Sequence, residues 1–384
     1  MNLLFVCSGT AGHVNPALAI AEQLKNKIPD AKILFIGAGR EMENKLVPQA
    51  GYEIKNIKMS GLKRKPSLKM AAHNIKTIKN LFAAKKEIFE IMKNFKPDVV
   101  IGTGGYVCYP VIKAAFKLKI PTVIHESNVS PGLAVKMLSG IADNVFTSFP
   151  GTELKYKKPP RVIYTGVPVM PAADKGGEAG AQSSVTAGGK TPSMPLIVSF
   201  WGSLGAERMN EMMPRFIDLL IKDGKYRHIH AAGNADSARR IKEEISLQTG
   251  VSCISEFFEI REYIDDMQTV LRAADIVLCR AGGATIGEIT AHKKPAVLVP
   301  SPYVSNNEQE ENAKQLEKLG GAVVLEEKNC DGEVLYNRVA SILDDENKRK
   351  KMSEALSAMS RPHAASSIAE HVISLAKKTA NQLG

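Results

Sequence analysis

Short apolar runs alternate with longer amphipathic segments along almost the whole chain, and this alternation is what most constrains the fold. Helical spacing of apolar residues fills the intervals, for example over residues 17–27, 210–222, 285–291 and 308–319. Strand–helix–strand repeats form right-handed units whose parallel sheets carry helices on both faces. The sequence therefore predicts an α/β protein built on doubly wound parallel sheets. The predicted strands are 3–7, 33–36, 99–101, 122–125, 145–147, 196–200, 228–232, 276–279, 296–299 and 322–325.

The strands fall into two series of five, separated by a segment with no periodic apolar pattern. Residues 171–195 are rich in Gly, Ala, Ser and Thr, which is typical of a flexible linker or a loop insertion. The chain of 384 residues is also long enough for about two domains. We therefore predict two domains and an interdomain cleft. The predicted boundaries are 1–167 for the first domain, 168–194 for the linker, 195–360 for the second domain and 361–384 for a final helix.

Composition excludes several classes of protein. Hydrophobic residues make up 44% of the chain and charged residues 24%, which is an ordinary globular balance rather than that of a disordered or collagenous chain. No apolar run approaches the ~20 residues that a transmembrane helix needs, and no signal peptide is visible. The five cysteines are scattered without a CxxC pair, so we expect reduced thiols, no structural zinc and a cytoplasmic location.

Positive charge is concentrated in the first half. Residues 1–170 hold 25 Lys and Arg against 11 Asp and Glu, and residues 55–96 hold twelve basic residues against two acidic ones. Apolar residues recur there at helical spacing between lysines, which predicts either a core-facing helix or a face that docks on an anionic membrane. With one Trp and no recognised module, we expect no nucleic-acid partner. The apolar residues at issue are Ile75, Ile78, Leu81, Phe82, Ile88, Phe89 and Met92.

The turn after the first predicted strand carries the strongest chemical signal. Ligands of open α/β sheets bind where the strands end. Residues 8–13 form a glycine-containing loop, and a helix is expected to begin near Asn15 and Pro16, so the loop suits an anion. The glycine spacing is not the dinucleotide fingerprint, and the phosphate-loop lysine is absent. His13 is a candidate base, and the alternative is a capping or packing histidine.

Two further polar turns follow strands of the same predicted domain. Residues 102–106 form a second glycine loop, and residues 125–128 form a cluster of His, Glu, Ser and Asn. Either turn alone is consistent with a tight connection, but three such turns in one domain indicate a site. The His–Glu pair has no second ligand pair at metal spacing, so no metal is predicted there.

The second predicted domain repeats this arrangement. Loops 201–206 and 280–285 each join a strand to a helix, and their backbone N–H groups suit a diphosphate. Glu288 lies one turn into the following helix, where a carboxylate can accept both hydroxyls of a ribose or simply complement the helix dipole. Asp265 and Asp266 precede Met267, and we interpret them as helix-capping residues rather than metal ligands.

Taken in order, these motifs resemble glycosyltransferase family 28. The resemblance covers nearly the whole chain except residues 171–195, and its motifs are Gly9 to Pro16, 60–62, 96–100, 102–107, 125–128, 131–133, 202–206, 263–267, 279–288 and 309–313. It implies the GT-B fold, in which two Rossmann-like parallel-sheet domains face a cleft. The donor would bind the C-terminal half and the acceptor the N-terminal half.

The resemblance also implies a reaction and a place for it. An inverting transfer would move GlcNAc from UDP-GlcNAc to the MurNAc 4-hydroxyl of undecaprenyl-pyrophosphoryl-MurNAc-pentapeptide (lipid I), giving lipid II for peptidoglycan. The enzyme would be peripheral, on the anionic cytoplasmic face of the cell membrane. It would need no cofactor and no obligatory metal, because helix N-termini and backbone amides can stabilise the leaving UDP.

The same resemblance assigns roles to residues of this sequence. His13 would be the catalytic base. Ser203 and the 282–285 loop would hold the phosphates, Ile264 the uracil and Glu288 the ribose, while Gln309 and Asn128 would lie near the sugar. The donor-binding set is Thr10, Ala11, Gly12, Asn128, Ser203, Ile264, Gly283, Ala284, Thr285, Ile286, Gly287, Glu288 and Gln309. The acceptor-binding set is Gly102, Thr103, Gly104, Gly105, Tyr106 and Glu126.

The chain departs from the family pattern at a few positions, and three other functions stay open. The family commonly has Arg where Met170 stands, and often His where Glu308 stands, while Ser8, Ala11 and Ser127 also differ. The alternatives are a GT-B transferase with another lipid acceptor, a UDP-GlcNAc 2-epimerase, and a non-catalytic sugar-nucleotide sensor.

Overall fold

A computed structural model describes residues 1–58, 84–155, 161–170, 194–203, 205–250, 257–304 and 307–383. The chain divides into two compact units. The N-terminal unit comprises Met1–Met170 together with Arg361–Gly384, and the C-terminal unit comprises Pro171–Ser360. Residues 171–193 of the predicted linker (168–194), and Ile75, Ile78, Leu81 and Phe82 of the predicted membrane face, lie outside the described residues.

The N-terminal unit is built on a seven-stranded sheet whose paired strands all run parallel. The chain starts near the middle of this sheet, builds outward to one edge, and then crosses back to build the other half. The strand order therefore reverses between β1 and β4, and this switch point is where such sheets bind ligands. In spatial order the strands are β3 (Glu53–Asn56), β2 (Lys32–Gly37), β1 (Asn2–Cys7), β4 (Val99–Gly104), β5 (Thr122–Glu126), β6 (Asn144–Thr147) and β7 (Val162–Tyr164).

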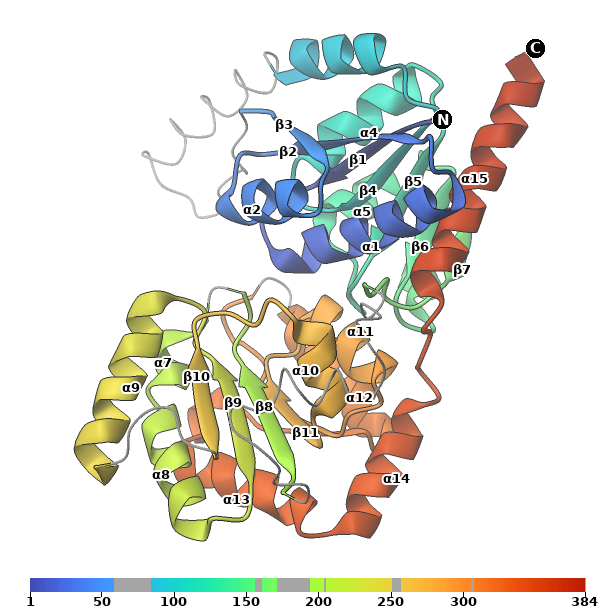
Figure 1. Ribbon diagram of the computed structural model, residues 1–384. Coiled ribbons are helices and arrows are strands. Elements are labelled where there is room, and N and C mark those ends of the chain that lie inside the picture. The colour runs from blue at the N-terminus through green and yellow to red at the C-terminus, as the bar shows by residue number, and fades with distance from the viewer. Residues whose placement is uncertain are drawn as a thin grey trace, which may run out of the picture. The chain divides into compact units, whose positions relative to one another are not determined.

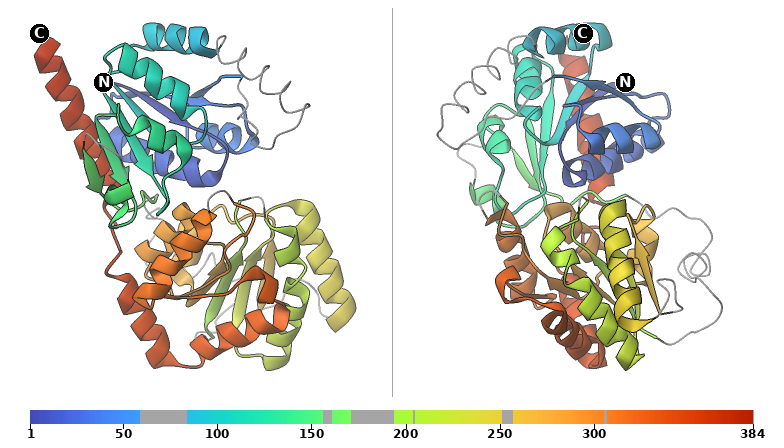
Figure 2. Two further views of the ribbon diagram at one scale, coloured as in Figure 1. Left: turned by 180° about the vertical axis from the view of Figure 1, so that it is seen from behind. Right: turned by 90° about the vertical axis from the view of Figure 1, so that its left-hand side faces the viewer.

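Helices cover both faces of this sheet (Figures 1 and 2). Because side chains alternate along a strand, Leu3 and Phe5 of β1 join one apolar cluster while Leu4 and Val6 join another. The C-terminal helix α15 packs with α1 on the first of these faces. The helices are α1 (Ala11–Lys27), α2 (Glu41–Gln49), a helix over 84–95, α4 (Cys108–Lys117), α5 (Leu133–Leu138), the short η1 (Thr152–Lys155) and α15 (Ala364–Leu383).

The C-terminal unit repeats this plan with six parallel strands, and its order reverses between β8 and β11. In spatial order the strands are β10 (Phe258–Arg261), β9 (Arg227–Ala231), β8 (Leu196–Phe200), β11 (Ile276–Cys279), β12 (Ala296–Leu298) and β13 (Ala322–Val324). The helices are α7 (Glu207–Asn210), α8 (Met213–Asp223), α9 (Ala235–Thr249), α10 (Met267–Ala273), α11 (Gly283–Ala291), α12 (Glu308–Leu319), η3 (Glu327–Asn329), α13 (Gly332–Leu343) and α14 (Glu346–Leu356).

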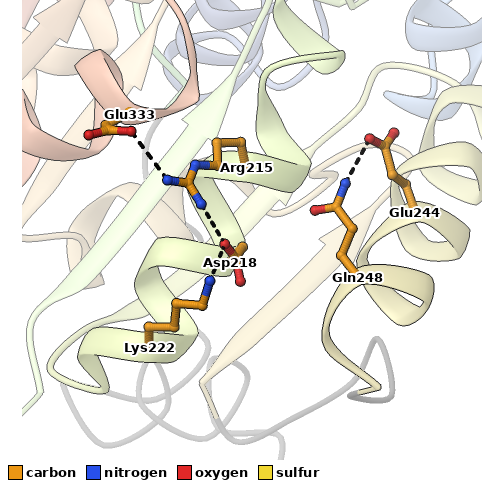
Figure 3. Close-up of polar contacts among 6 residues, drawn as sticks. All are labelled: Arg215, Asp218, Lys222, Glu244, Gln248 and Glu333. Carbon is orange, nitrogen blue, oxygen red and sulfur yellow. Dashed lines mark hydrogen bonds and ion pairs between the residues drawn. The ribbon is translucent and has the colours of Figure 1, made fainter.

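Charged side chains line the outer surface where α8 meets α13 (Figure 3). Asp218 lies 2.9 Å from Arg215 and 2.8 Å from Lys222, and Arg215 reaches Glu333 of α13 at 3.2 Å. Asp218 is buried, but its partners Arg215 and Lys222 are exposed, and pairs that reach solvent in this way contribute only about 0–1 kcal/mol each. The apolar cluster beneath them, which includes Phe216, therefore does most to hold α8 in place.

The structure confirms every predicted strand and corrects other expectations. Three strands were missed, namely β3, β7 and β10. Helix α1 begins at Ala11 rather than near Asn15, so Pro16 lies inside the helix instead of at its start. The helix predicted over 210–222 is α8, which begins at Met213, and a short helix that was not predicted, α7, ends at Asn210. Asp266 stands at the N-cap of α10, but its carboxylate pairs with Arg261 at 3.2 Å instead of capping the helix.

The basic segment of the first half is partly described. Its last part is the helix over 84–95. Ile88 and Met92, which the sequence placed on the possible membrane face, are buried in the core with Ala84, so their side of this helix faces inward. In the described part of the chain, no helix is long and apolar enough to cross a bilayer.

Candidate functional site

The first candidate site lies where β1 and β4 end, at the switch point of the N-terminal unit. The Ser8 amide donates to the Gly104 carbonyl at 3.3 Å, which ties the two loops together. Gly9 has φ +100° and is exposed, Thr10 is the N-cap of α1, and the first turn of α1 has no acidic residue. The amides of a first helical turn lack intrahelical partners and carry the positive end of the dipole. The loop that contains Thr10, Ala11 and Gly12 is therefore suited to a negatively charged or hydroxyl-rich ligand.

His13 is held in one orientation at this site. Its Nδ1 lies 2.8 Å from the Ser8 carbonyl oxygen, and the Thr103 hydroxyl donates to the His13 carbonyl at 2.7 Å. A carbonyl oxygen can only accept, so Nδ1 carries the hydrogen and Nε2 keeps its lone pair in the neutral ring. Burial lowers the pKa of His13 below its ordinary value, which favours this neutral form.

The glycine loop after β4 packs directly on His13. A Cβ at Gly104 would overlap the imidazole, and a Cβ at Gly105 would overlap Ser8, so both positions require glycine. Gly102 and Thr103 are buried in β4, whereas Gly105 and Tyr106 reach the surface. The Tyr106 side chain also forms a hydrogen bond with Arg40. The predicted acceptor loop therefore offers a ligand Gly105 and Tyr106, while its earlier residues shape the site from inside.

The loop after β5 is braced by Glu126, which is buried. One carboxylate oxygen accepts from the Asn128 amide at 2.9 Å and from the Asn128 side chain at 3.2 Å, and the other accepts from the Gly132 amide at 2.8 Å. Glu126 therefore shapes the loop, and the half-buried Asn128 is its more accessible polar side chain. His125 is buried as well, and burial lowers its pKa to about 4, so it stays neutral.

Sequence reasoning missed Glu43, which links the loops after β1 and β2. This carboxylate is fully buried and accepts three backbone N–H groups, those of Gly9, Ala38 and Arg40, each at 3.0 Å. The only local signal was a glutamate in the first turn of a helix that follows a strand. Such a residue is common as a dipole partner, so its tertiary role was not visible.

The second candidate site lies where β8 and β11 end, in the C-terminal unit. Helix α11 begins at Gly283 with Gly282 as its N-cap and has no acidic residue in its first turn. The buried Asn312 side chain donates to the Ala281 carbonyl at 3.0 Å and braces this turn. A helix N-terminus of this kind is suited to a diphosphate.

Other predicted donor residues of this unit lie in the loop after β8 and in α11 itself. Ser203 is half-buried in the loop after β8, where Gly202 has φ +89°. Ala284 and Thr285 are half-buried in the first turn of α11, whereas Ile286 and Gly287 are buried on its inner side. The sequence predicts that all of residues 283–288 bind the donor. In the structure only some of them are accessible to a ligand, and the others are buried in the unit.

Glu288 is the perturbed carboxylate of this unit. Burial raises its pKa to about 7. Burial, and secondarily the charge of Glu288, raises the pKa values of the neighbouring Tyr263 and Cys279. Ile264, next to Tyr263 in the chain, is buried. A half-buried carboxylate that gains hydroxyl donors from a ligand becomes easier to ionise. Glu288 is thus equipped to accept hydrogen bonds from vicinal hydroxyls.

A cavity of about 580 Å³ lies beside Gln309 in the same unit. The Gln309 side-chain oxygen accepts from the Ser301 amide at 2.9 Å, which leaves its NH₂ group as the donor that a ligand would meet. The cavity is also lined by Arg280 and Glu327, a buried ion pair at 2.5 Å that sequence reasoning missed.

The predicted donor residues come from both units. Thr10, Ala11, Gly12 and Asn128 belong to the N-terminal unit, and the other predicted donor residues belong to the C-terminal unit. Within the described ranges, no group of three or more His, Cys, Asp or Glu side chains is arranged to hold a metal ion.

Known structures share the fold. MurG of Acinetobacter baumannii superposes with a TM-score of 0.71 at 24% identity, over 97% of this chain and 99% of that one. The UDP-GlcNAc 2-epimerase of Neisseria meningitidis superposes with a TM-score of 0.65 at 14% identity, over 97% of this chain and 100% of that one. At these identities the likeness shows a GT-B type of fold, with two parallel-sheet α/β units, and nothing finer.

Sequence comparisons are more specific. A relative from Acetivibrio thermocellus is 39% identical over 99% of this chain and 100% of its own length, and one from Caldanaerobacter subterraneus subsp. tengcongensis is 40% identical over 95% and 97%. Both are named UDP-N-acetylglucosamine--N-acetylmuramyl-(pentapeptide) pyrophosphoryl-undecaprenol N-acetylglucosamine transferase. The family models for the glycosyltransferase family 28 N-terminal and C-terminal domains match residues 3–147 and 196–370. With both domains matched in order and relatives aligned end to end, this chain belongs to glycosyltransferase family 28.

Proposed function

We propose that this chain transfers GlcNAc from UDP-GlcNAc to undecaprenyl-pyrophosphoryl-MurNAc-pentapeptide, giving lipid II for peptidoglycan synthesis. The observation that carries this proposal is the end-to-end identity of 39–40% to relatives named for that reaction. The epimerase alternative has only a shared fold in its favour, at 14% identity. The enzyme is a UDP-GlcNAc-dependent N-acetylglucosaminyltransferase.

His13 is the base of this reaction. Its Nε2 lone pair takes the proton from the MurNAc 4-hydroxyl while that oxygen attacks C1 of GlcNAc. The new C1–O bond forms as the bond between C1 and the UDP oxygen breaks, and UDP leaves with the electron pair, so the configuration inverts. The contact between Nδ1 and the Ser8 carbonyl at 2.8 Å keeps the ring in the tautomer that this step needs.

The C-terminal unit holds the donor and stabilises the leaving UDP. The first turn of α11 and Ser203 meet the diphosphate, where helix-terminal amides offset the charge that develops on it. Glu288 accepts the ribose hydroxyls, the backbone at Ile264 meets uracil, and the Gln309 NH₂ group donates to a sugar hydroxyl. On the N-terminal unit, Tyr106 and Gly105 meet the acceptor's pyrophosphate.

UDP release tests this proposal. Wild type and His13→Gln would be incubated with UDP-GlcNAc in EDTA, with and without a soluble short-chain lipid I analogue. We expect acceptor-dependent release by the wild type and a loss of about 10²–10⁴-fold in kcat in His13→Gln, with UDP binding retained. Full activity in His13→Gln would contradict the base assignment.

The same assay separates the alternative functions. Conversion of UDP-GlcNAc without an acceptor would identify an epimerase. Transfer to another lipid but not to the lipid I analogue would identify a different glycolipid transferase. Binding of UDP-GlcNAc with no turnover under any condition would identify a sensor.

We further propose that the N-terminal unit docks on an anionic membrane surface. At the end of α4, Phe116 and Leu118 are 51% and 43% exposed and alternate with Lys117 and Lys119. A cavity of about 190 Å³ between α4 and the helix over 84–95 adds an apolar recess lined by Phe89, among others. Exposed aromatic and aliphatic side chains among lysines are typical of a surface that binds anionic lipid.

A further inference from the structure

One peptide group joins the buried Glu43 to the proposed base. The N–H of the Ser8–Gly9 peptide donates to the Glu43 carboxylate at 3.0 Å. The C=O of the same peptide accepts from His13 Nδ1 at 2.8 Å. The carboxylate, the peptide and the imidazole therefore form a single chain of hydrogen bonds.

Glu43 is held firmly in this position. Its side chain is fully buried, and its other oxygen accepts the amides of Ala38 and Arg40 at 3.0 Å each. Hydrogen bonds from N–H groups to a carboxylate are charge-assisted, short and stronger than neutral ones. Because α2 supplies Glu43 and the loop after β2 supplies two of its donors, the carboxylate keeps its place against the loop after β1.

We propose that Glu43 is a positioning residue for the reaction and acts on His13 through the Ser8–Gly9 peptide group. The carboxylate polarises the peptide N–H, which increases the negative charge on the Ser8 oxygen. The bond from Nδ1–H to that oxygen is strengthened, because hydrogen bonds in a chain polarise one another. The ring is then held as the Nδ1–H tautomer, and the imidazolium that forms when Nε2 takes a proton is stabilised.

The proposed role of Glu43 resembles that of carboxylates in other enzymes, except that a peptide group lies between the carboxylate and the imidazole. In serine hydrolases a carboxylate that bonds directly to Nδ1–H orients the imidazole and stabilises its cation, and metal-bound histidines use carboxylates or backbone carbonyls in the same way. Here both groups are present: the Ser8 carbonyl accepts from His13, and the Glu43 carboxylate accepts from the N–H of the same peptide group. The inference rests on the role of His13 proposed above.

The effect of the Glu43 charge on the pKa of His13 agrees with this geometry. Burial lowers the pKa of His13, whereas the Ser8 carbonyl and the charge of Glu43 raise it. His125 of β5, which burial keeps neutral, also interacts with His13. Removal of the Glu43 charge should therefore lower the pKa of His13 further and weaken it as a base.

A titration of His13 by NMR in the full-length protein, with ¹⁵N-labelled histidine, tests this without relying on turnover. We expect Glu43→Gln to lower the pKa of His13 by about half a unit or more and to reduce the Nδ1–H tautomer population. The acid limb of the rate profile should move to lower pH by the same amount. We expect kcat to fall about tenfold or more, while KM for UDP-GlcNAc stays within about twofold.

Glu41→Gln is the matched control, because Glu41 is an exposed carboxylate on the same helix turn. It should leave the His13 titration and kcat unchanged. A folded Glu43→Gln protein with an unchanged His13 pKa and tautomer would overturn the inference and leave Glu43 as a brace alone.

Glu43→Asp keeps the test open if Glu43→Gln does not fold. Aspartate retains the charge but is one methylene shorter, so we expect a His13 pKa between those of the wild type and a neutral variant. A His13 titration identical to that of the wild type would contradict the inference, because the peptide contact would then not matter. Failure of His13→Gln to lose activity would instead contradict the proposed function, so the two failures are distinguishable.

Discussion

Gly104 has no side chain because the imidazole of His13 occupies the place where its Cβ would lie. Its φ of +129° also lies in a region that residues with side chains rarely adopt. The glycine loop after β4 is thus a packing surface for the base as well as a candidate ligand loop. The contact between the two loops therefore places the proposed base against the loop that we propose binds the acceptor.

Gly104→Ala should displace His13 and reduce kcat by about 10²-fold, because a shift of about 1 Å in a reacting group costs that much. Gly140→Ala is the control, since a Cβ at Gly140 would meet no atom within 4 Å. The measurement is acceptor-dependent UDP release, with UDP binding as a check on folding. Activity near the wild-type level in Gly104→Ala would show that the ring does not depend on this contact.

Glu288 should make donor binding depend on pH. With its pKa near 7 in the free protein, the carboxylate is protonated as the pH falls below 7 and then accepts hydroxyl donors poorly. The Kd for UDP should rise about tenfold between pH 8 and pH 6. Calorimetry on the wild type and Glu288→Gln would test this: the variant should bind UDP more weakly at pH 8 and lose most of the pH dependence.

At the level of elements, burial decided which strands the sequence revealed. Strands β1, β4, β8 and β11 lie inside their sheets and are buried on both faces, so they appear as continuous apolar runs. The three strands that were missed, β3, β7 and β10, all lie at sheet edges. Edge strands such as β3, with sequence Glu-Ile-Lys-Asn, are short and partly exposed, so no apolar run marks them.

The pairing of β8 with β9 buries a cluster of one serine and two histidines. This cluster should make the stability of the C-terminal unit sensitive to acid. The Ser199 hydroxyl lies 2.7 Å from His228 Nε2 and 2.7 Å from His230 Nδ1. Burial lowers the pKa of His230 to about 3 and that of His228 well below its ordinary value. Both rings are therefore neutral in the folded protein.

The direction of the pH dependence follows from the difference in proton binding between the folded and the unfolded chain. Below about pH 6.5 the unfolded chain takes up protons that the folded chain does not, so stability falls as pH falls, by about 1.4 kcal/mol per pH unit for each histidine. Urea unfolding followed by the fluorescence of Trp201, the single Trp, reports on this unit. We expect a marked loss of stability between pH 6.5 and pH 5, unchanged in the exposed control His363→Gln. A flat profile would contradict the neutral assignment.

At the scale of the whole molecule, charge is distributed unevenly between the two units. The excess of lysine and arginine lies in residues 1–170, which form most of the N-terminal unit, and the exposed Phe116 and Leu118 belong to that unit too. A basic surface with exposed apolar side chains suits an enzyme whose acceptor is an anionic lipid.

Membrane docking should therefore be lost when that surface is made acidic. The double variant Phe116→Asp, Leu118→Asp should reduce co-sedimentation with anionic liposomes about tenfold or more, and salt should weaken wild-type binding. Leu247→Asp is the control, because Leu247 is 87% exposed on α9 of the C-terminal unit. Equal losses in both variants, or none in either, would contradict a docking face on α4.

The sequence by itself determined the α/β class, the inner strands, the glycine loops and the candidate base, because these depend on local pattern and on turn chemistry. The tertiary structure decided which residues from distant parts of the sequence contact these elements. Glu43 reaches Gly9 across 34 positions of sequence, and α15 joins the N-terminal unit although it ends the chain. A residue's local propensity is set by its neighbours in sequence, whereas the partner of a buried carboxylate or an apolar helix face is set by which distant segments fold against it.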